Sequence, residues 1–144
     1  MREILFRGQT RRWGERRKNA AGDPLPSNWE YGGLFYQNDR GGDYSIIYSY
    51  DPVEKYVVYA DTVGQYTGLD DKNGQKIFEG DILSFANSDG DVCYLTVVYD
   101  RGMFMVEERG IICREGLCEV LCLGIEVAGN IYDNPELLKR GQDK

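Results

Sequence analysis

Five oxygen-bearing side chains crowd the middle of the sequence and are the first candidates for chemistry. They are Asp70, Asp71, Asn73, Glu79 and Asp81. A calcium loop places oxygen ligands at alternate positions and a glycine at its sixth position. Counted from Asp71 the sixth residue is Lys76, and counted from Asp70 it is Gln75. This spacing argues against a metal site, and we expect solvated acids of a turn instead.

Catalytic motifs are absent from the sequence. The chain contains no histidine, which excludes Ser-His-Asp and Cys-His catalysis. No glycine-rich run is followed by Lys-Ser or Lys-Thr, so a phosphate-binding loop is excluded as well. Composition permits acid–base chemistry by a carboxylate pair or a tyrosine, but no spacing supports it. We therefore predict a protein that is not an enzyme and uses no cofactor.

The cysteines also fail to make a site. They are Cys93, Cys113, Cys118 and Cys122. Structural zinc sites usually show two close pairs of ligands, whereas the gaps here are 19, 4 and 3 intervening residues. Thiols stay reduced in the cytoplasm. We expect buried free thiols that pack as small hydrophobic side chains.

A basic cluster near the amino terminus is the remaining candidate. Residues 1–18 carry a net charge of +5, which leaves −12 on the rest of a chain with net charge −7. Five residues of the cluster are candidates for binding nucleic acid or another partner, namely Arg11, Arg12, Trp13, Arg16 and Arg17. An arginine stacked on Trp13 inside the fold, or a basic loop docked on an acidic body, explains the same pattern. We favour these structural explanations and keep the binding site as an alternative.

The elements that must position these residues are mainly strands. Short runs of β-branched and aromatic residues predict strands at residues 2–7, 29–36, 44–50, 56–60, 92–99, 103–106 and 111–113. Gly8 is expected to end the first strand, and Gly32-Gly33 permits a bulge or a close backbone approach. Residues 9–28 predict a basic, irregular loop.

The central stretch, residues 62–83, predicts two strands joined by the turn Lys72-Asn73-Gly74. The Asn-Gly pair indicates a tight turn with positive φ. In the following Glu79-Gly80-Asp81-Ile82, Gly80 relieves crowding where the strand bends, and Ile82 points inward. This stretch is expected to set the register of the sheet.

The carboxyl-terminal part is less regular. Residues 117–123 fit either a helical stripe or a strand. Asn134 as N-cap, Pro135 at the first helical position and Glu136 in the first turn predict a short helix, with residues 139–144 as a frayed tail. We predict a single domain over residues 1–144 that is mainly β. It is a small, partly closed SH3-like barrel or a sandwich of short antiparallel strands, with a short C-terminal helix.

No apolar run approaches the roughly 20 residues that span a bilayer, and the amino terminus lacks a signal-peptide pattern. We therefore expect a soluble, cytoplasmic protein that does not enter a membrane.

Three blocks of the sequence resemble the YopX family of bacteriophage and prophage proteins. The first is residues 1–8 (MREILFRG). The second comprises residues 62–69 (TVGQYTGL), 71–74 (DKNG) and 79–82 (EGDI), and the third is residues 127–138 (VAGNIYDNPELL). The resemblance implies a β-rich protein in a bacterial host cell. That family has no established biochemical activity, so no catalytic residue is carried over. The long basic segment at residues 9–28 departs from the family pattern.

Together these observations predict a phage or prophage accessory protein that is a non-enzymatic module. We expect it to form a homo-oligomer or to bind a host or phage protein, because tyrosines are abundant and unpaired sheet edges are costly. The alternative is a nucleic-acid-binding protein that uses the basic cluster.

Overall fold

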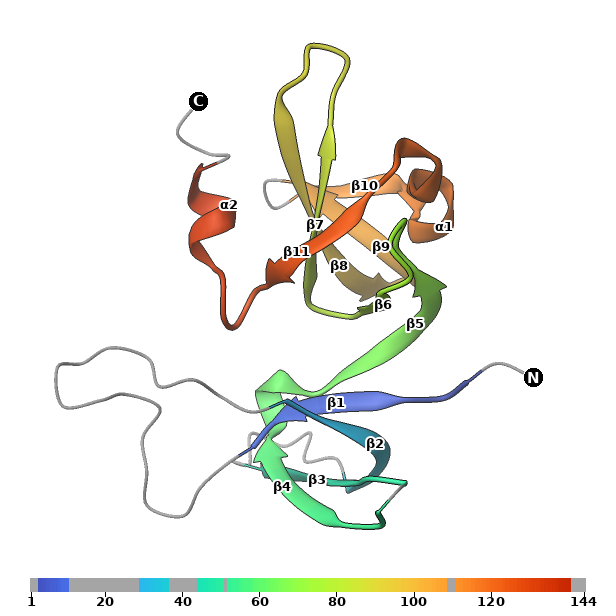
Figure 1. Cartoon of the computed structure of the whole chain (residues 1–144), viewed down its shortest axis with the longest axis vertical. Helices are drawn as coiled ribbons and strands as arrows, with labels where there is room; N and C mark the ends of the chain where they lie inside the picture. Colours follow the sequence, from blue (N-terminus) through green and yellow to red (C-terminus); the bar gives the residue numbers. More distant parts are fainter. Residues whose placement is uncertain (1–2, 11–28, 37–43, 51, 109–110, 141–144) are drawn as a thin grey trace, which may run out of the picture. The chain divides into compact units, whose positions relative to one another are not determined.

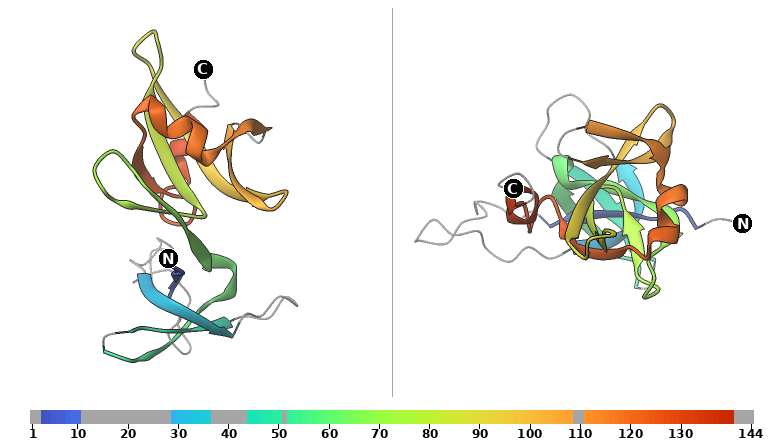
Figure 2. Two further views of the ribbon diagram at one scale, coloured as in Figure 1. Left: turned by 90° about the vertical axis from the view of Figure 1, so that its right-hand side faces the viewer. Right: turned by 90° about the horizontal axis from the view of Figure 1, so that it is seen from above.

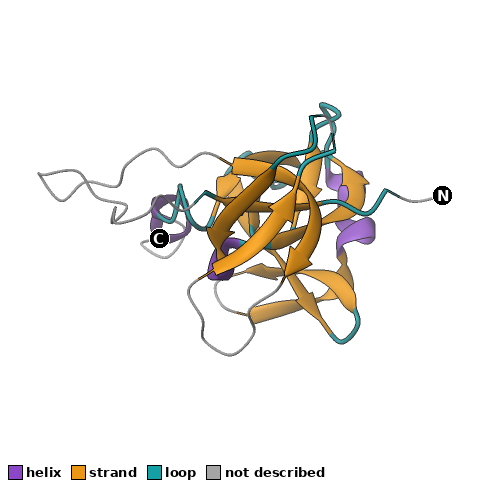
Figure 3. Ribbon diagram, turned by 90° about the horizontal axis from the view of Figure 1, so that it is seen from below, coloured by secondary structure: helices purple, strands orange, loops and turns teal. Residues whose placement is uncertain are grey.

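The computed structural model describes residues 3–10, 29–36, 44–50, 52–108 and 111–140, and its side-chain description omits residues 111–115 and 139–140. The chain forms two compact units, Met1–Gln65 (unit 1) and Tyr66–Lys144 (unit 2). Strands dominate the described residues of both units (Figures 1 and 3). The prediction of a mainly β protein of short antiparallel strands with a short C-terminal helix is confirmed. The single-domain organisation stays a prediction.

Unit 1 is an antiparallel sheet in the order β4-β3-β2-β1. Its strands are β1 (Phe6–Gln9), β2 (Trp29–Tyr36), β3 (Tyr44–Tyr48) and β4 (Lys55–Tyr59). Arg7 of β1 also pairs with Gly64, the first residue of β5 (Gly64–Asp70). Thr10, which follows β1, forms an isolated antiparallel bridge with Val58 of β4. This bridge links the end of β1 to β4. Between them in the chain, β2 is visibly bent (Figure 2).

Two glycines allow the strands of unit 1 to approach closely. A Cβ atom at Gly8 would lie 2.7 Å from the Cγ2 atom of Val58. A Cβ atom at Gly32 would overlap the backbone carbonyl oxygen of Tyr48. The predicted close approach at Gly32 is therefore confirmed, and a side chain at either position would push the strands apart.

The interior of unit 1 is small and mixed in polarity. Its described buried apolar side chains are Leu5, Ile47 and Val58, and its buried polar ones are Arg7, Gln9, Ser45 and Thr62. The Thr62 hydroxyl accepts the backbone N–H of Gln9 at 2.9 Å and donates to the Tyr59 carbonyl at 2.7 Å. The bond from Gln9 ties the 3-10 turn η1 (Ala60–Thr62) to β1, and the bond to Tyr59 holds the turn to the end of β4.

Unit 2 contains the second antiparallel sheet, in the order β10-β9-β8-β7-β11. Its elements after β5 are β6 (Lys76–Phe78), β7 (Asp81–Ala86), β8 (Val92–Asp100), β9 (Met103–Glu108), β10 (Ile111–Gly116), α1 (Leu117–Val120), the 3-10 turn η2 (Leu121–Leu123), β11 (Glu126–Asn130) and α2 (Glu136–Arg140). The β8–β9 hairpin turns at Arg101 and Gly102, which have φ angles of 54° and 78°. The described strands form no closed barrel, and the SH3-like arrangement stays a prediction.

An aliphatic core fills unit 2. It consists of Ile77, Leu83, Leu95, Val97, Val106, Leu117, Val120 and Ile125. Strands β6 to β9 contribute by alternation, and Leu117 and Val120 of α1 supply the helical stripe that the sequence left undecided. Ile82 is fully buried, as predicted. Most of the described buried apolar side chains therefore belong to unit 2.

Three predicted boundaries at the amino terminus are wrong. The first strand, predicted from residue 2, begins at Phe6. Gly8 lies inside β1 instead of ending it, and Gln9, expected in the basic loop, is the last residue of that strand. The reason is tertiary, because Gly8 packs against Val58 and Thr10 bridges to the same residue. Residues 11–28 lie outside the described part of the chain.

The short carboxyl-terminal helix is present, as predicted. Asn134 Oδ1 accepts the backbone N–H of Asn130 at 3.2 Å, and the Asn134 carbonyl accepts the N–H of Leu137 at 3.1 Å. The helix extends to Arg140, so its last turn includes two residues assigned to the frayed tail. Asn134 therefore fastens the end of β11 to the start of α2.

Candidate interaction surface

A β-bulge at the end of β2 decides which side chains unit 1 presents. Leu34 pairs with Ile47 and Tyr36 pairs with Ile46, so Phe35 is an extra residue between two successive pairs. In a bulge two residues of one strand oppose a single residue of its partner, which redirects their side chains. The bulge therefore brings two consecutive aromatic residues against β3.

The ring contacts show that both aromatic residues lie on the same face. The Phe35 ring packs edge-to-face on Tyr48, with centroids 5.3 Å apart, and the Tyr36 ring lies 5.8 Å from that of Tyr44. Tyr44 and Tyr48 are four residues apart in β3 and so project from one face. We call Phe35, Tyr36, Tyr44 and Tyr48 the aromatic patch.

The aromatic patch is open to solvent, whereas the other face of the same strand is buried. Phe35 is 71% exposed, and Tyr36 and Tyr44 are 42% and 41% exposed. On the opposite face, Ser45 and Ile47 are fully buried. Strand β3 thus alternates between a buried side and an exposed aromatic side.

The described residues of β2, β3 and β4 bring few charges to the face that carries the aromatic patch. Lys55 of β4 lies directly opposite Tyr48, and Glu30 of β2 projects from the other face by alternation. Among the described residues of β2, β3 and β4, Lys55 is the charged side chain on this face. Tyrosine-rich surfaces with few charges are typical of protein-binding sites.

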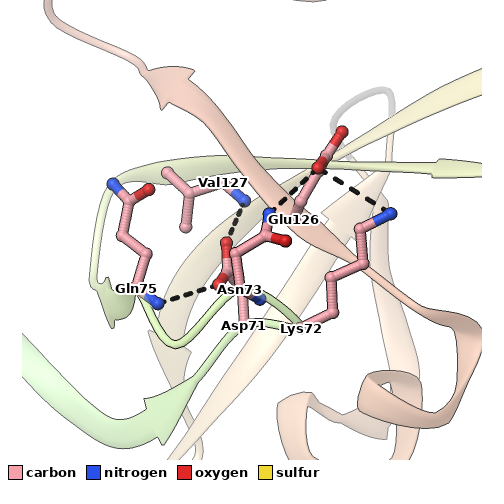
Figure 4. A network of polar contacts seen from close by, with 6 residues as sticks. All are labelled: Asp71, Lys72, Asn73, Gln75, Glu126 and Val127. Atoms are coloured by element: carbon pink, nitrogen blue, oxygen red, sulfur yellow. Dashed lines mark hydrogen bonds and ion pairs between the residues drawn. The ribbon is translucent and has the colours of Figure 1, made fainter.

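The acids of the central turn play a different part from the one expected. Asp71 is 7% exposed and its carboxylate accepts three backbone N–H groups (Figure 4). Oδ1 accepts those of Asn73 at 2.8 Å and Gln75 at 2.9 Å, and Oδ2 accepts that of Val127 at 2.9 Å. The prediction of a solvated turn acid is therefore wrong for Asp71. Its side chain closes the β5–β6 turn and joins it to β11.

Protonation of Asp71 responds to two opposing influences. Burial favours the neutral form and by itself would raise its pKa, but the three N–H donors favour the anion. Together with the charge of Lys72 they hold the pKa of Asp71 below its ordinary value. An ionised acid held by these three donors is a structural group, and its lowered pKa makes it a weak base.

Asp81 is the second buried acid, with 1% of its surface exposed. Its Oδ2 atom accepts the N–H of Phe78 at 2.7 Å. Gly80, with a φ of 92°, lies between them, and its N–H and carbonyl bond to Val97 and Ile131. The predicted bend at Gly80 is confirmed, and the prediction of a solvated Asp81 is wrong. This corner also belongs to the scaffold.

The other predicted site residues give no second site. Arg11, Arg12, Trp13, Arg16 and Arg17 all lie outside the described residues. Within the described part of the chain, no group of three or more acidic or cysteine side chains is placed to hold a metal ion. No helix among those residues is long and apolar enough to cross a membrane.

The cysteines are less buried than predicted. Cys118 and Cys122 are exposed and Cys93 is partly buried, while the side chain of Cys113 is outside the description. The helical segment explains the error, because Leu117 and Val120 face the core and turn the cysteines outward. The described thiols therefore contribute little to the core.

Comparison with known proteins places the chain in a family. Residues 27–139 match the family model described as YopX protein. The crystal structure of protein EF1440 from Enterococcus faecalis is similar, with 25% sequence identity and a TM-score of 0.51. That match covers 96% of this chain and 99% of the other. No curated protein matches the chain significantly. The chain belongs to the YopX protein family.

Proposed function

We propose that this protein is a non-enzymatic accessory module of a bacteriophage or prophage that binds proteins through the aromatic patch of unit 1. The observation that carries the proposal is the exposure of Phe35, Tyr36 and Tyr44 on one sheet face, where Lys55 is the charged side chain among the described residues of β2 to β4. Aromatic side chains supply large contact areas at a low cost in conformational entropy, and their loss from interfaces is costly.

The composition of unit 1 supports the same conclusion. Unit 1 accounts for seven of the eleven exposed large hydrophobic residues in the described chain, and for three of the fifteen buried ones. A contiguous exposed apolar patch on a soluble protein commonly marks an interaction site. Covering this face would add apolar burial that unit 1 lacks among its own described residues.

A binding experiment with matched variants tests the proposal. The immobilised protein is compared with its Phe35→Lys and Tyr99→Lys variants for capture of bacterial proteins, and each is measured for self-association by light scattering. Tyr99 is a matched control because it is 56% exposed and its ring packs edge-to-face on Phe104, with centroids 5.2 Å apart in unit 2.

We expect Phe35→Lys to lose binding and Tyr99→Lys to retain it. A wild-type protein that neither self-associates nor captures any protein would overturn the proposal. Equal losses in the two variants would also overturn it, because they would point to general stickiness of exposed aromatic residues.

A further inference from the structure

We infer that Asn73 is a site of spontaneous covalent modification by deamidation, and that the folded turn around it controls the rate. Asparagine is among the chemically labile residue types of proteins. Asn73 is the only asparagine of the sequence that is followed by glycine. Because glycine has no Cβ atom, its backbone nitrogen can approach the preceding side chain without hindrance. The inference concerns unit 2 and is independent of the proposed protein-binding function.

The reaction needs no reactant besides the chain and water. The backbone nitrogen of Gly74 loses its proton and attacks Cγ of Asn73, so that a new N–Cγ bond forms. The Cγ–Nδ2 bond breaks, and the leaving group takes up a proton from solvent and departs as ammonia. One water molecule then opens the cyclic imide at either of its carbonyl carbons. The product at residue 73 is aspartate or isoaspartate, and no atom is oxidised or reduced.

The folded turn opposes the first step. The N–H of Gly74 donates to the carbonyl of Asp71 at 3.0 Å, which closes a four-residue β-turn. A lone pair left by that proton would point at the Asp71 carbonyl and not at Cγ of Asn73. Attack therefore requires this hydrogen bond to break, and the reaction proceeds through transient opening of the turn.

Two carboxylates hold the turn in its closed form (Figure 4). Oδ1 of the buried Asp71 accepts the N–H groups of Asn73 at 2.8 Å and Gln75 at 2.9 Å. Oε2 of Glu126 accepts Nδ2 of Asn73 at 3.2 Å, so the amide that must react is held toward β11. The side chain of Asn73 is exposed, and water therefore reaches it as soon as the turn opens.

The modification would reverse the contacts that delay it. The new carboxylate changes the net charge from −7 to −8 and lies where the amide faced Glu126. Lys72 Nζ lies 3.8 Å from the same Glu126 oxygen, but an exposed ion pair of this kind offsets little repulsion. Isoaspartate also adds a methylene group to the main chain inside the turn, which displaces the Gln75 N–H from Asp71. Deamidation therefore loosens the joint between the β5–β6 turn and β11.

The wild-type protein tests the site and its control by the fold. It is incubated in mildly alkaline buffer, folded or unfolded in urea, and deamidation is followed by peptide mass spectrometry with detection of isoaspartate. We expect Asn73 to react at least about tenfold more slowly in the folded protein. Asn87, which precedes Ser88, is the internal reference and should stay an amide over the same period. Equal rates in the two states would overturn the control by the turn, and an unreactive Asn73 in the unfolded chain would overturn the site.

Variants of the two carboxylates test which contacts keep the turn closed. Asp71→Ala should accelerate deamidation in the folded protein by about tenfold, because a buried acceptor of several N–H groups is lost. Glu126→Ala should accelerate it by about two- to threefold, because its bond to Asn73 is exposed to water. Asp89→Ala, at an exposed acid of the β7–β8 turn, should change the rate by less than about twofold.

The pattern of the three variants decides the mechanism. Wild-type rates in both Asp71→Ala and Glu126→Ala would overturn the part assigned to the carboxylates. If Asp71→Ala fails to fold, Glu126→Ala and the comparison of folded with unfolded wild type still decide.

A mimic of the product tests the consequence. Asn73→Asp reproduces the aspartyl form, and Asn73→Ser removes the same amide without adding charge. We expect the Val127 amide to exchange with solvent about two- to threefold faster in Asn73→Asp than in Asn73→Ser, because the added charge faces Glu126. Protein aged to deamidation should show the same acceleration. Exchange at Val127 that is unchanged in both the mimic and the aged protein would overturn the loosening.

Discussion

The two units differ in the side chains that fill their interiors. Unit 2 has an aliphatic core of eight buried side chains, and two buried aspartates that accept backbone N–H groups at its turns. In unit 1 the described interior holds Leu5, Ile47 and Val58 beside four polar side chains. Phe35, Tyr36 and Tyr44 instead lie on an exposed face. Under the proposed function, unit 2 is the scaffold and unit 1 presents the contact surface.

The units also reach compactness differently. Unit 1 depends on close approach of its backbones at Gly8 and Gly32, because its described residues supply few large side chains to the interior. Unit 2 depends on side-chain packing, with Asp71 and Asp81 closing the turns. A side chain added at Gly8 or Gly32 should therefore destabilise unit 1 far more than unit 2. Loss of the carboxylate at Asp71 or Asp81 should destabilise unit 2 far more than unit 1.

The largest effect is expected from Gly32→Ala. The added methyl group overlaps the backbone oxygen of Tyr48, which cannot move without displacing β3, and overpacking of this kind costs about 3 kcal/mol or more. Gly33→Ala is the matched control. Its Cβ atom would meet the movable hydroxyl of Tyr50 at 3.1 Å, and we expect a loss below about 1 kcal/mol.

Tryptophan fluorescence during urea unfolding measures this difference in unit 1 alone, because both tryptophans, Trp13 and Trp29, precede residue 66. Equal stability of the two variants would contradict the dependence of unit 1 on backbone approach.

The next largest effect is expected from Asp71→Asn in unit 2. The amide keeps one acceptor oxygen but turns an NH₂ group toward one of the backbone N–H donors, and loses the charge that strengthens all three bonds. We expect a loss of about 2–3 kcal/mol. Asp89→Asn, in the exposed β7–β8 turn, should cost less than about 0.5 kcal/mol.

Hydrogen exchange measures the effect of Asp71→Asn where fluorescence does not report. Faster exchange of the Val127 amide, with the amides of unit 1 unchanged, is the expected pattern. Unchanged exchange at Val127 would mean that Asp71 does not join the turn to β11.

The pH dependence gives a smaller and more specific effect. The lowered pKa of Asp71 in the folded protein means that its contribution to stability is complete above the pKa of the unfolded chain, about 4. The contribution is lost as the pH falls through the lower pKa of the folded state. The stability difference between wild type and Asp71→Asn should therefore be constant from neutral pH to about pH 4 and shrink below it.

Hydrogen exchange of unit 2 amides at a series of pH values, corrected for intrinsic exchange, measures this difference. A difference that grows on acidification would have the wrong sign for a carboxylate stabilised as the anion.

Much of the fold could be predicted from the chain alone, because alternation and turn residues act locally. The turn at Asn73-Gly74 has its expected positive φ at Gly74, 81°, and the helix after Pro135 follows from its first-turn residues. The buried Asp71 had a local signal as well. An aspartate two residues before Asn73 can accept the N–H groups of its own turn. Its third bond, to Val127, joins residues 56 apart and has no local signal.

The aromatic patch could not be located in the same way. Simple alternation along β2 places Phe35 and Tyr36 on opposite faces, and the extra residue in the register with β3 brings them together. The sequence shows that Gly32-Gly33 permits a bulge, but the pairing of two strands decides where it falls. The exposure of Cys118 and Cys122 could not be predicted either, because it depends on Leu117 and Val120 facing the core.

The sequence by itself determined the class of the protein: a β-rich member of the YopX family without histidine-based catalysis, with its turns where glycine and asparagine favour them. These properties depend on backbone conformation and residue chemistry within a few positions. Only the tertiary structure decided that Asp71 and Asp81 are buried, that Gly32 lies against Tyr48, and that the aromatic residues of β2 and β3 share an exposed face. Each of these facts depends on which distant strand lies alongside, and a single register shift changes it.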